Sequence, residues 1–165
     1  MTLRNYVSIC VLLFSIYSCS SGIDKTYSLN AIELNMEGPL FEGPNSVSAM
    51  HKVDLSSIGV SADKINHAYI SKVRVYLPDS SNFNLFGDFK FQLTADEASM
   101  VECAQLNPIP SNVSSVDLKT SSEADLKDFF KLSEFVILMD GNLKEDYFEN
   151  VNFKADLEFT INVTE

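Results

Sequence analysis

Histidines that could act as a general base are few in this chain. His51 and His67 are its only histidines, and a Ser–His–acid hydrolase would need one of them as a positioned general base. The Gly-x-Ser-x-Gly segment that presents a nucleophilic serine is missing. His51 shares the apolar phase of residues 47–55, which indicates a core or half-buried histidine, with a catalytic role as the alternative. A metal site using both histidines would need them on adjacent strands, and nothing in the sequence indicates this.

The cysteines suggest a buried thiol and no disulfide framework. Cys103 has the same strand phase as Val101, so we expect it in the core. The alternative, a reactive thiol, would need nearby cations to lower its pKa, and lysine and arginine are sparse around it. Cys10 lies in an N-terminal apolar run and Cys19 at its end, so no pairing within the folded domain is expected.

Paired carboxylates are the second kind of candidate chemistry, because two of them at a suitable separation can hydrolyse a glycosidic bond. The available pairs lie in polar loops or on a helix face, where solvated charges are expected. They are Asp96-Glu97, Glu145-Asp146 and Asp125 with Asp128.

A possible set of calcium ligands follows a glycine. Asp140 and Asn142 flank Gly141, and Glu145 and Asp146 come shortly after; their oxygens are of the kind that calcium accepts. The spacing does not match the twelve-residue EF-hand loop. An ordinary turn is therefore expected, with calcium binding as the alternative, and no cofactor is predicted.

Two apolar groups interrupt polar loops. Two Glu-Gly-Pro segments, at 37–39 and 42–44, bracket Leu40 and Phe41. Exposed apolar tips often mark contact sites, and loops on a rigid scaffold commonly carry binding. The alternative is that both groups fold back and fill the open ends of the domain. The predicted partner-binding residues are Leu40, Phe41, Phe83 and Phe86.

Composition limits the elements that could position these residues. The chain has 165 residues, is 45% hydrophobic and carries 12 basic against 23 acidic residues, for a net charge of −11. This length fits one domain, and the hydrophobic content supports a core and excludes a wholly disordered chain. The acidity argues against binding to nucleic acid, because no basic patch could neutralise the phosphates.

Alternation of apolar and polar residues predicts strands. Residues 151–163 alternate strictly, which is typical of a strand with one buried and one wet face. Tyr27 and Leu29 fall out of phase with Ile32, so a bulge is expected near Ala31. Strands are also predicted over 47–55, 73–77, 89–95, 100–106, 114–119 and 135–140, about eight in all.

Turn signals and one helix complete the prediction. Turns are expected at 37–39, 42–44, 78–80, 108–110 and 140–142, and a capping-box-like start at Ser122 predicts a short helix over 123–131. Short strands at this spacing favour an all-β fold, an antiparallel two-sheet sandwich that is Greek-key or immunoglobulin-like. The alternative fold is a β-barrel.

Residues 1–22 predict a targeting segment. Arg4 precedes an apolar run from Tyr6 to Tyr17, and twelve helical residues span only ~18 Å of a hydrocarbon core that is ~30 Å thick. The run therefore fits the apolar region of a signal peptide and not a membrane-spanning helix.

Ile16-Tyr17-Ser18-Cys19 resembles the lipobox of bacterial lipoproteins. In that family an aliphatic residue at −3 and a small residue at −1 precede the cysteine that becomes the acylated first residue. Ile16, Ser18 and Cys19 match this pattern, and Tyr17 departs from it because a small or aliphatic residue is usual there. The resemblance implies lipidation at Cys19, and Ser20 implies sorting to the outer membrane; an ordinary secretory peptide is the alternative.

Residues 26–163 also resemble the small sandwich lipoproteins of bacterial envelopes in the order of their elements: an alternating strand over 67–77, an aromatic loop over 82–86 and an acidic helix over 123–131. The predicted organisation is a signal peptide over 1–18, a lipidated tether over 19–25 and a sandwich domain over 26–165. The predicted function is a non-catalytic, membrane-anchored binding or scaffold module, whose partner is an envelope protein or a glycan. An envelope hydrolase that uses an acidic pair is the alternative.

Overall fold

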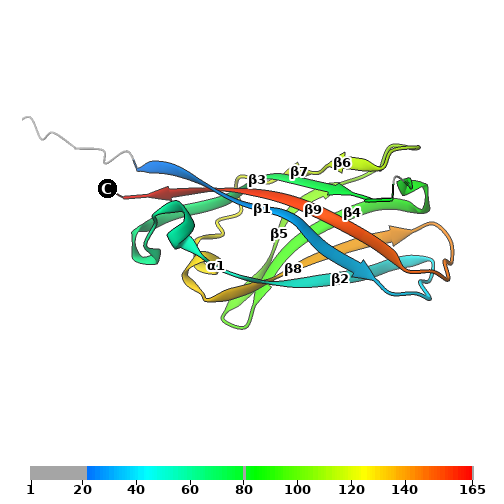
Figure 1. Ribbon diagram of the computed structural model, residues 1–165, viewed down its shortest axis with the longest axis horizontal. Coiled ribbons are helices and arrows are strands. Elements are labelled where there is room, and N and C mark those ends of the chain that lie inside the picture. The colour runs from blue at the N-terminus through cyan, green and yellow to red at the C-terminus, as the bar shows by residue number, and fades with distance from the viewer. Residues whose placement is uncertain (1–21, 80, 165) are drawn as a thin grey trace, which may run out of the picture.

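The computed structural model describes residues 22–79 and 81–164, which form two antiparallel sheets packed face to face (Figure 1). The predicted signal peptide and Cys19 lie outside the described residues. The four-stranded sheet has the order β1 (Ile23–Met36), β9 (Val151–Val163), β3 (Ile65–Tyr76) and β6 (Ser115–Asp117). The five-stranded sheet has the order β2 (Gly43–Lys52), β8 (Glu134–Leu143), β4 (Phe86–Ala95), β5 (Ala98–Leu106) and β7 (Lys119–Thr120).

The strand order is that of a jelly roll. With the two-residue β7 set aside, the first strand pairs with the last, the second with the next to last, β3 with β6, and β4 with β5, all antiparallel. A jelly roll contains two Greek keys, so the predicted antiparallel sandwich of Greek-key type is confirmed. An immunoglobulin domain groups its strands differently. The barrel alternative is wrong, because the described strands form two separate sheets.

The predicted bulge in the first strand is confirmed. The pairing of β1 with β9 shifts between Leu29 and Ile32, and Ala31 has a positive φ of 54°. The Asp156 carboxylate accepts a hydrogen bond from the Ala31 backbone amide at 2.8 Å. β1 also begins earlier than expected, since Ile23 already pairs with Val163, within the segment predicted to be a tether.

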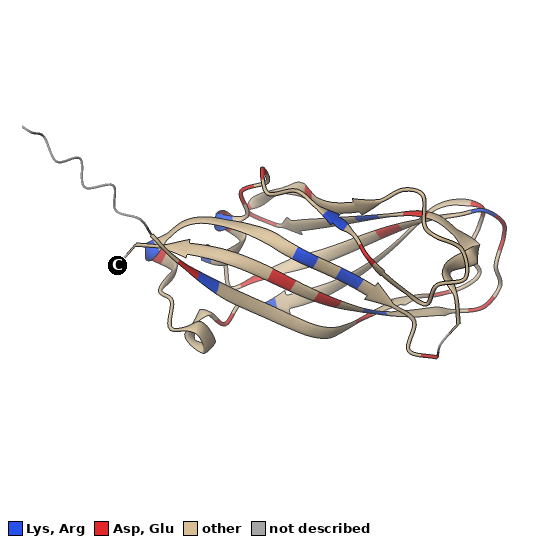
Figure 2. Ribbon diagram, turned by 90° about the horizontal axis from the view of Figure 1, so that it is seen from above, with Lys and Arg blue, Asp and Glu red and all other residues tan. Residues whose placement is uncertain are grey.

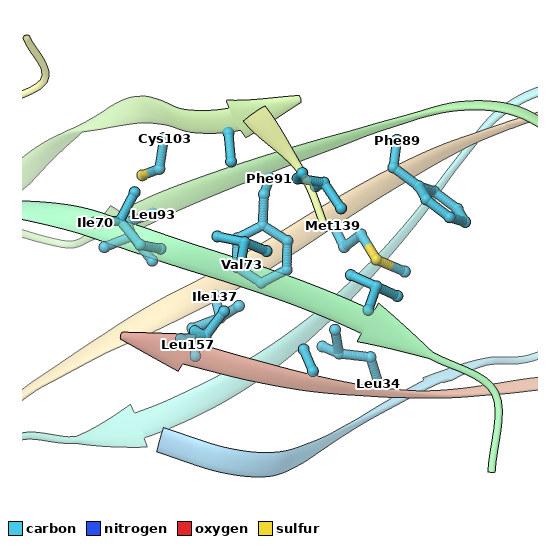
Figure 3. Close-up of a cluster of buried hydrophobic side chains, with 14 of the residues drawn as sticks. Leu34, Ile70, Val73, Phe89, Phe91, Leu93, Cys103, Ile137, Met139 and Leu157 are labelled. Carbon is cyan, nitrogen blue, oxygen red and sulfur yellow. The ribbon is translucent and has the colours of Figure 1, made fainter. Parts of the chain in front are cut away.

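Aromatic rings pack the two ends of the core. Near the start of β1, Phe159 contacts Tyr27 and Phe130, and its ring centroid lies 5.1 Å from that of Phe130. The middle of the core is mostly aliphatic, with Leu157 among its members, and includes the ring of Phe91 (Figure 3). The opposite end is filled by four phenylalanines: Phe83, Phe86, Phe89 and Phe153.

Phe83 and Phe86 are therefore core residues, and their prediction as partner-binding residues is wrong. Phe83, in the short 3₁₀-helix η3 (Phe83–Leu85), and Phe86, at the start of β4, are both fully buried. Burying such a ring gains about 1.5–3 kcal/mol over leaving it in water, so these residues close the end of the sandwich, as the alternative interpretation proposed.

The connections differ from prediction in two places. The predicted turns at 42–44 and 140–142 are wrong, because Gly43 pairs with Leu143 and Asn45 with Gly141 inside β2 and β8. Gly141 has a packing reason: a Cβ there would lie 3.0 Å from the ring of Phe86.

The helix is shorter than predicted. α1 covers only Lys127–Lys131, because the residues before it are bound to β3. Leu126 donates its amide to the carbonyl of Ala68 at 2.7 Å, and Asp125 accepts from the Ala68 amide. Two further 3₁₀-helices, η1 (Leu55–Ile58) and η2 (Ala62–Lys64), follow β2. Across the part of the chain that the structure describes, no helix has the length and apolar character needed to cross a bilayer.

Candidate functional site

The two histidines lie in different sheets, and each is close to a polar side chain. His51 is half-buried on β2, and its Nε2 lies 2.8 Å from the hydroxyl of Tyr27. Burial lowers the pKa of His51. This confirms the predicted half-buried histidine.

His67 lies on β3 of the other sheet, and its Nδ1 is 3.0 Å from Asp125 Oδ1. The idea that both histidines share a metal is wrong, because their strands belong to different sheets. Among residues 22–79 and 81–164, no group of three histidine, cysteine or acidic side chains is arranged to hold a metal ion.

Cys103 is the buried thiol that its strand phase predicts. It is fully buried on β5, and its Sγ donates to the carbonyl of Val101 at 3.3 Å. Burial raises the pKa of its thiol to about 12, so the thiolate that reacts with electrophiles is scarce at neutral pH.

The residues weighed as alternative calcium ligands are engaged in hydrogen bonds between strands and loops. Asp140 accepts from the Ser46 hydroxyl at 2.6 Å and from the Gln92 amide at 2.6 Å, and Asn142 donates to Asp88 at 3.2 Å. Asp146 accepts from the Glu42 amide at 2.8 Å. Asp140 therefore links β8 to β2 and β4, and Asp146 links the loop after β8 to the loop before β2.

The acidic pairs have different surroundings. Asp125 accepts hydrogen bonds from two backbone amides, and Asp128 pairs with Lys131 at 3.5 Å. Asp96 and Glu97 differ: together with Glu134 they line a hollow of about 200 Å³, beside the exposed Met50. The structure therefore brings three exposed carboxylates to one depression at the turn between β4 and β5.

The candidate contact site is what we call the distal tip, formed by residues 37–42 between β1 and β2 and residues 144–150 between β8 and β9. Figure 1 shows both loops at the opposite end of the sandwich from the C-terminus and from the start of β1. The 14-residue β1 joins the two ends; at ~3.3 Å per residue it spans roughly 45 Å.

Hydrogen bonds hold the two loops of the distal tip together. Leu40 and Tyr147 exchange both backbone hydrogen bonds, at 2.7 and 2.9 Å. Gly38 donates its amide to Asn150 Oδ1 at 2.9 Å, and Phe41 accepts at its carbonyl from the Asn45 side chain at 2.7 Å. The tip is thus fixed before any partner arrives, which lowers the entropy lost on docking.

The distal tip exposes one predicted residue and one that the sequence analysis missed. Leu40 is only 3% exposed, so its prediction as a contact residue is wrong; it points into the core from its pairing with Tyr147. Side chains alternate along paired segments, so the next residues point outward: Phe41 is 61% exposed and Phe148 is 75% exposed. Tyr147-Phe148 within an acidic loop is the same signal as Leu40-Phe41 and could have identified the second ring.

Gly38 lets the two loops approach each other. A Cβ at this position would lie 2.8 Å from the carbonyl oxygen of Glu149 and 3.0 Å from that of Phe148. Both are backbone atoms, which cannot move aside as the end of a flexible side chain could. The glycine is therefore needed for the close contact that positions Phe148.

Gly38→Ala should accordingly loosen the distal tip and lower the free energy of unfolding by about 1–3 kcal/mol, the usual cost of forcing extra volume into a packed site. Gly87→Ala is the matched control, because a Cβ there meets its nearest atom at an ordinary 3.5 Å. Urea titration of both variants measures the effect. Equal midpoints for the two would contradict the close approach at Gly38.

Comparisons with known proteins give no family. No protein-family model matches the chain, and no curated protein matches it. Among solved structures it is similar to a chain of Cocksfoot mottle virus, at 9% identity and a TM-score of 0.29, over 100% of this chain and 94% of that one. It is also similar to a chain of Desmodium yellow mottle tymovirus, at 8% identity and a TM-score of 0.27, over 100% and 95%. At these scores the similarities carry no functional argument.

Proposed function

We propose that this chain is a lipid-anchored lipoprotein of the bacterial envelope, whose jelly-roll domain is a non-catalytic binding module that contacts its partner through the distal tip. One observation carries the binding role: Phe41 and Phe148 stand exposed on loops that backbone hydrogen bonds hold together. An exposed ring forgoes about 1.5–3 kcal/mol of burial, so two of them on one fixed surface favour contact with another molecule.

The position of the tip supports anchoring at the other end. In the proposal Cys19 is acylated and lies three residues before the start of the described domain at Gly22. The distal tip would then face away from the membrane by the length of β1, roughly 45 Å. A protein of the envelope could reach it there without competing with the lipid surface. Sorting to the outer membrane through Ser20 is part of the same proposal.

An envelope hydrolase remains the second candidate function because Asp96, Glu97 and Glu134 line one hollow. Retaining and inverting glycosidases both need two carboxylates facing a bound sugar. The three side chains are exposed, as most charged side chains of folded proteins are, so their exposure does not by itself indicate catalysis. The binding role is favoured, because the exposed rings cost stability whereas solvated carboxylates do not.

Replacing both rings with serine separates contact from folding. In cells carrying Phe41→Ser with Phe148→Ser, chemical cross-linking of the protein to its envelope partner should fall at least fivefold. The urea midpoint should hardly move, because both rings are already in water in the unbound protein. Met50→Ser with Met100→Ser removes two exposed apolar residues elsewhere and should leave cross-linking unchanged. A double tip variant that unfolds much more readily would place the rings in the core and end the proposal.

A further inference from the structure

The exposed rings of the distal tip lie on the paired loops. Leu40 and Tyr147 lie directly opposite each other, and the residue that follows each of them, Phe41 or Phe148, is exposed. Because backbone hydrogen bonds join the two loops, both rings could contact the same apolar residue of a partner.

The same two loops carry five carboxylates. Glu42 follows Phe41 in the chain, Glu149 follows Phe148, and all the acidic residues of the two loops are exposed, whereas Lys144 is their only basic residue. The Lys144 ammonium is directed to the carbonyl of Asn84 at 3.1 Å. The acidic residues of the distal tip are Glu37, Glu42, Glu145, Asp146 and Glu149.

The negative charges of the tip affect the pKa of Tyr147. Tyr147 donates a hydrogen bond to Glu149 Oε2 at 3.4 Å, and its pKa is raised first by burial and then by the charges of Glu149 and Asp79. Asp79, from the loop after β3, therefore adds to the same field. The outer face of the four-stranded sheet is different, since there lysine and acidic residues alternate and pair, as between Lys72 and Glu158 at 3.1 Å (Figure 2).

This combination selects the chemistry of the partner. An apolar surface that also carries carboxylates attracts cationic groups and repels anionic ones, and aromatic faces also attract lysine and arginine. Anionic lipid headgroups would meet five like charges at the tip. A peptide segment with both cationic side chains and an apolar anchor would place its anchor against the aromatic rings and pair its cations with the carboxylates.

On the basis of the proposed binding function, we infer that the distal tip binds a cationic, apolar segment of a partner protein. In this complex Phe41 and Phe148 contact the apolar anchor of the segment, and the carboxylates of the two loops pair with its lysine or arginine side chains. Figure 1 places these two loops at the end of the sandwich remote from the start of β1.

The test uses the full acylated protein anchored in neutral phosphatidylcholine vesicles. The probe is a fluorescently labelled twelve-residue peptide of Lys-Leu-Phe repeats, and the comparator has Glu in place of each Lys. Anisotropy should show binding of the Lys peptide, weakened at least fivefold by Phe41→Ser with Phe148→Ser and also by Glu42→Gln with Glu149→Gln. Binding should weaken with added salt, because exposed charges are screened.

Matched controls separate the tip from the general acidity of the chain. Glu102→Gln with Glu123→Gln removes the same number of exposed charges elsewhere and should leave binding unchanged, as should Met100→Ser. Equal weakening by the control charges would show non-specific attraction and overturn the inference. Preference for the Glu peptide would also overturn it.

A membrane as the occupant is a separate outcome. If the tip bound anionic lipid, the anchored protein would bridge its vesicles to added phosphatidylglycerol vesicles and light scattering would rise; that result would overturn the inference. Failure of peptide binding, while photo-cross-links still form from the tip in intact envelopes, would contradict only the partner chemistry. Failure of both would contradict the proposed function as well.

Discussion

Phe159→Ala should lower the free energy of unfolding by about 3–5 kcal/mol, the usual cost of deleting a fully buried ring. Phe159 has no exposed surface, and it lies on β9 between Tyr27 of β1 and Ile70 of β3. Its ring packs edge-on against those of Phe130 and Phe135. A cavity there would be lined by residues of both sheets, which limits how far the structure can collapse around it.

Glu158→Ala is the matched control, one residue away on the same strand. Glu158 faces outward and pairs with Lys72 at 3.1 Å, with both side chains nearly half exposed. A surface ion pair of this kind contributes about 0–1 kcal/mol, so the urea midpoint should move little. Equal effects at 158 and 159 would mean that the alternation along β9 does not separate core from surface.

Cys19→Ala should abolish lipid labelling and release the protein from the membrane fraction. In the proposed function this cysteine carries the acyl chains, and stable anchoring needs more than one such chain. Growth with a clickable palmitate analogue followed by gel fluorescence measures the label, and membrane pelleting measures the release.

Cys10→Ala is the control for this experiment, because Cys10 lies within the predicted leader. The control should keep its label and stay in the membrane pellet. A Cys19→Ala protein that still carries the palmitate analogue would contradict lipidation at Cys19. The remaining interpretation would then be a secretory peptide and a freely secreted domain.

Strand phase was the strongest signal in the sequence. The strict alternation over 151–163 predicted β9 with its correct bounds, and the broken phase between Leu29 and Ile32 predicted the bulge at Ala31. Each signal is local, since a buried face and a bulge need only neighbouring residues to be recognised. The nested pairing of a jelly roll was not predictable, because alternation does not say which distant strand a given strand will meet.

Apolar residues in loops were the least predictable. Phe83, Leu40 and Phe41 have the same kind of polar surroundings in sequence, yet the first two are buried and only Phe41 is exposed. Leu40 differs from Phe41 because it pairs with Tyr147. This long-range contact sets which of the two side chains points inward. The same contact joins the loop of Phe41 to the loop of Phe148, and neither loop alone indicates it.

The predicted turn at Gly141 failed for a related reason. Glycine ordinarily marks a break in a strand, but here it lies within β8 because the ring of Phe86 occupies the space of a Cβ. Reading that glycine correctly would require knowing that the 83–86 segment folds inward. Local chemistry and long-range packing therefore gave opposite indications at this residue.

The most direct test of the account is photo-cross-linking from the distal tip in intact cells. Benzoylphenylalanine is incorporated in place of Phe148 and, in a separate control strain, in place of Met100, which is exposed on β5 away from the tip. After irradiation, the account predicts one discrete higher-mass adduct from position 148 and none from position 100. Adducts of equal yield from both positions, or none from position 148 in protein that is correctly anchored, would contradict the claim that the tip is the contact surface.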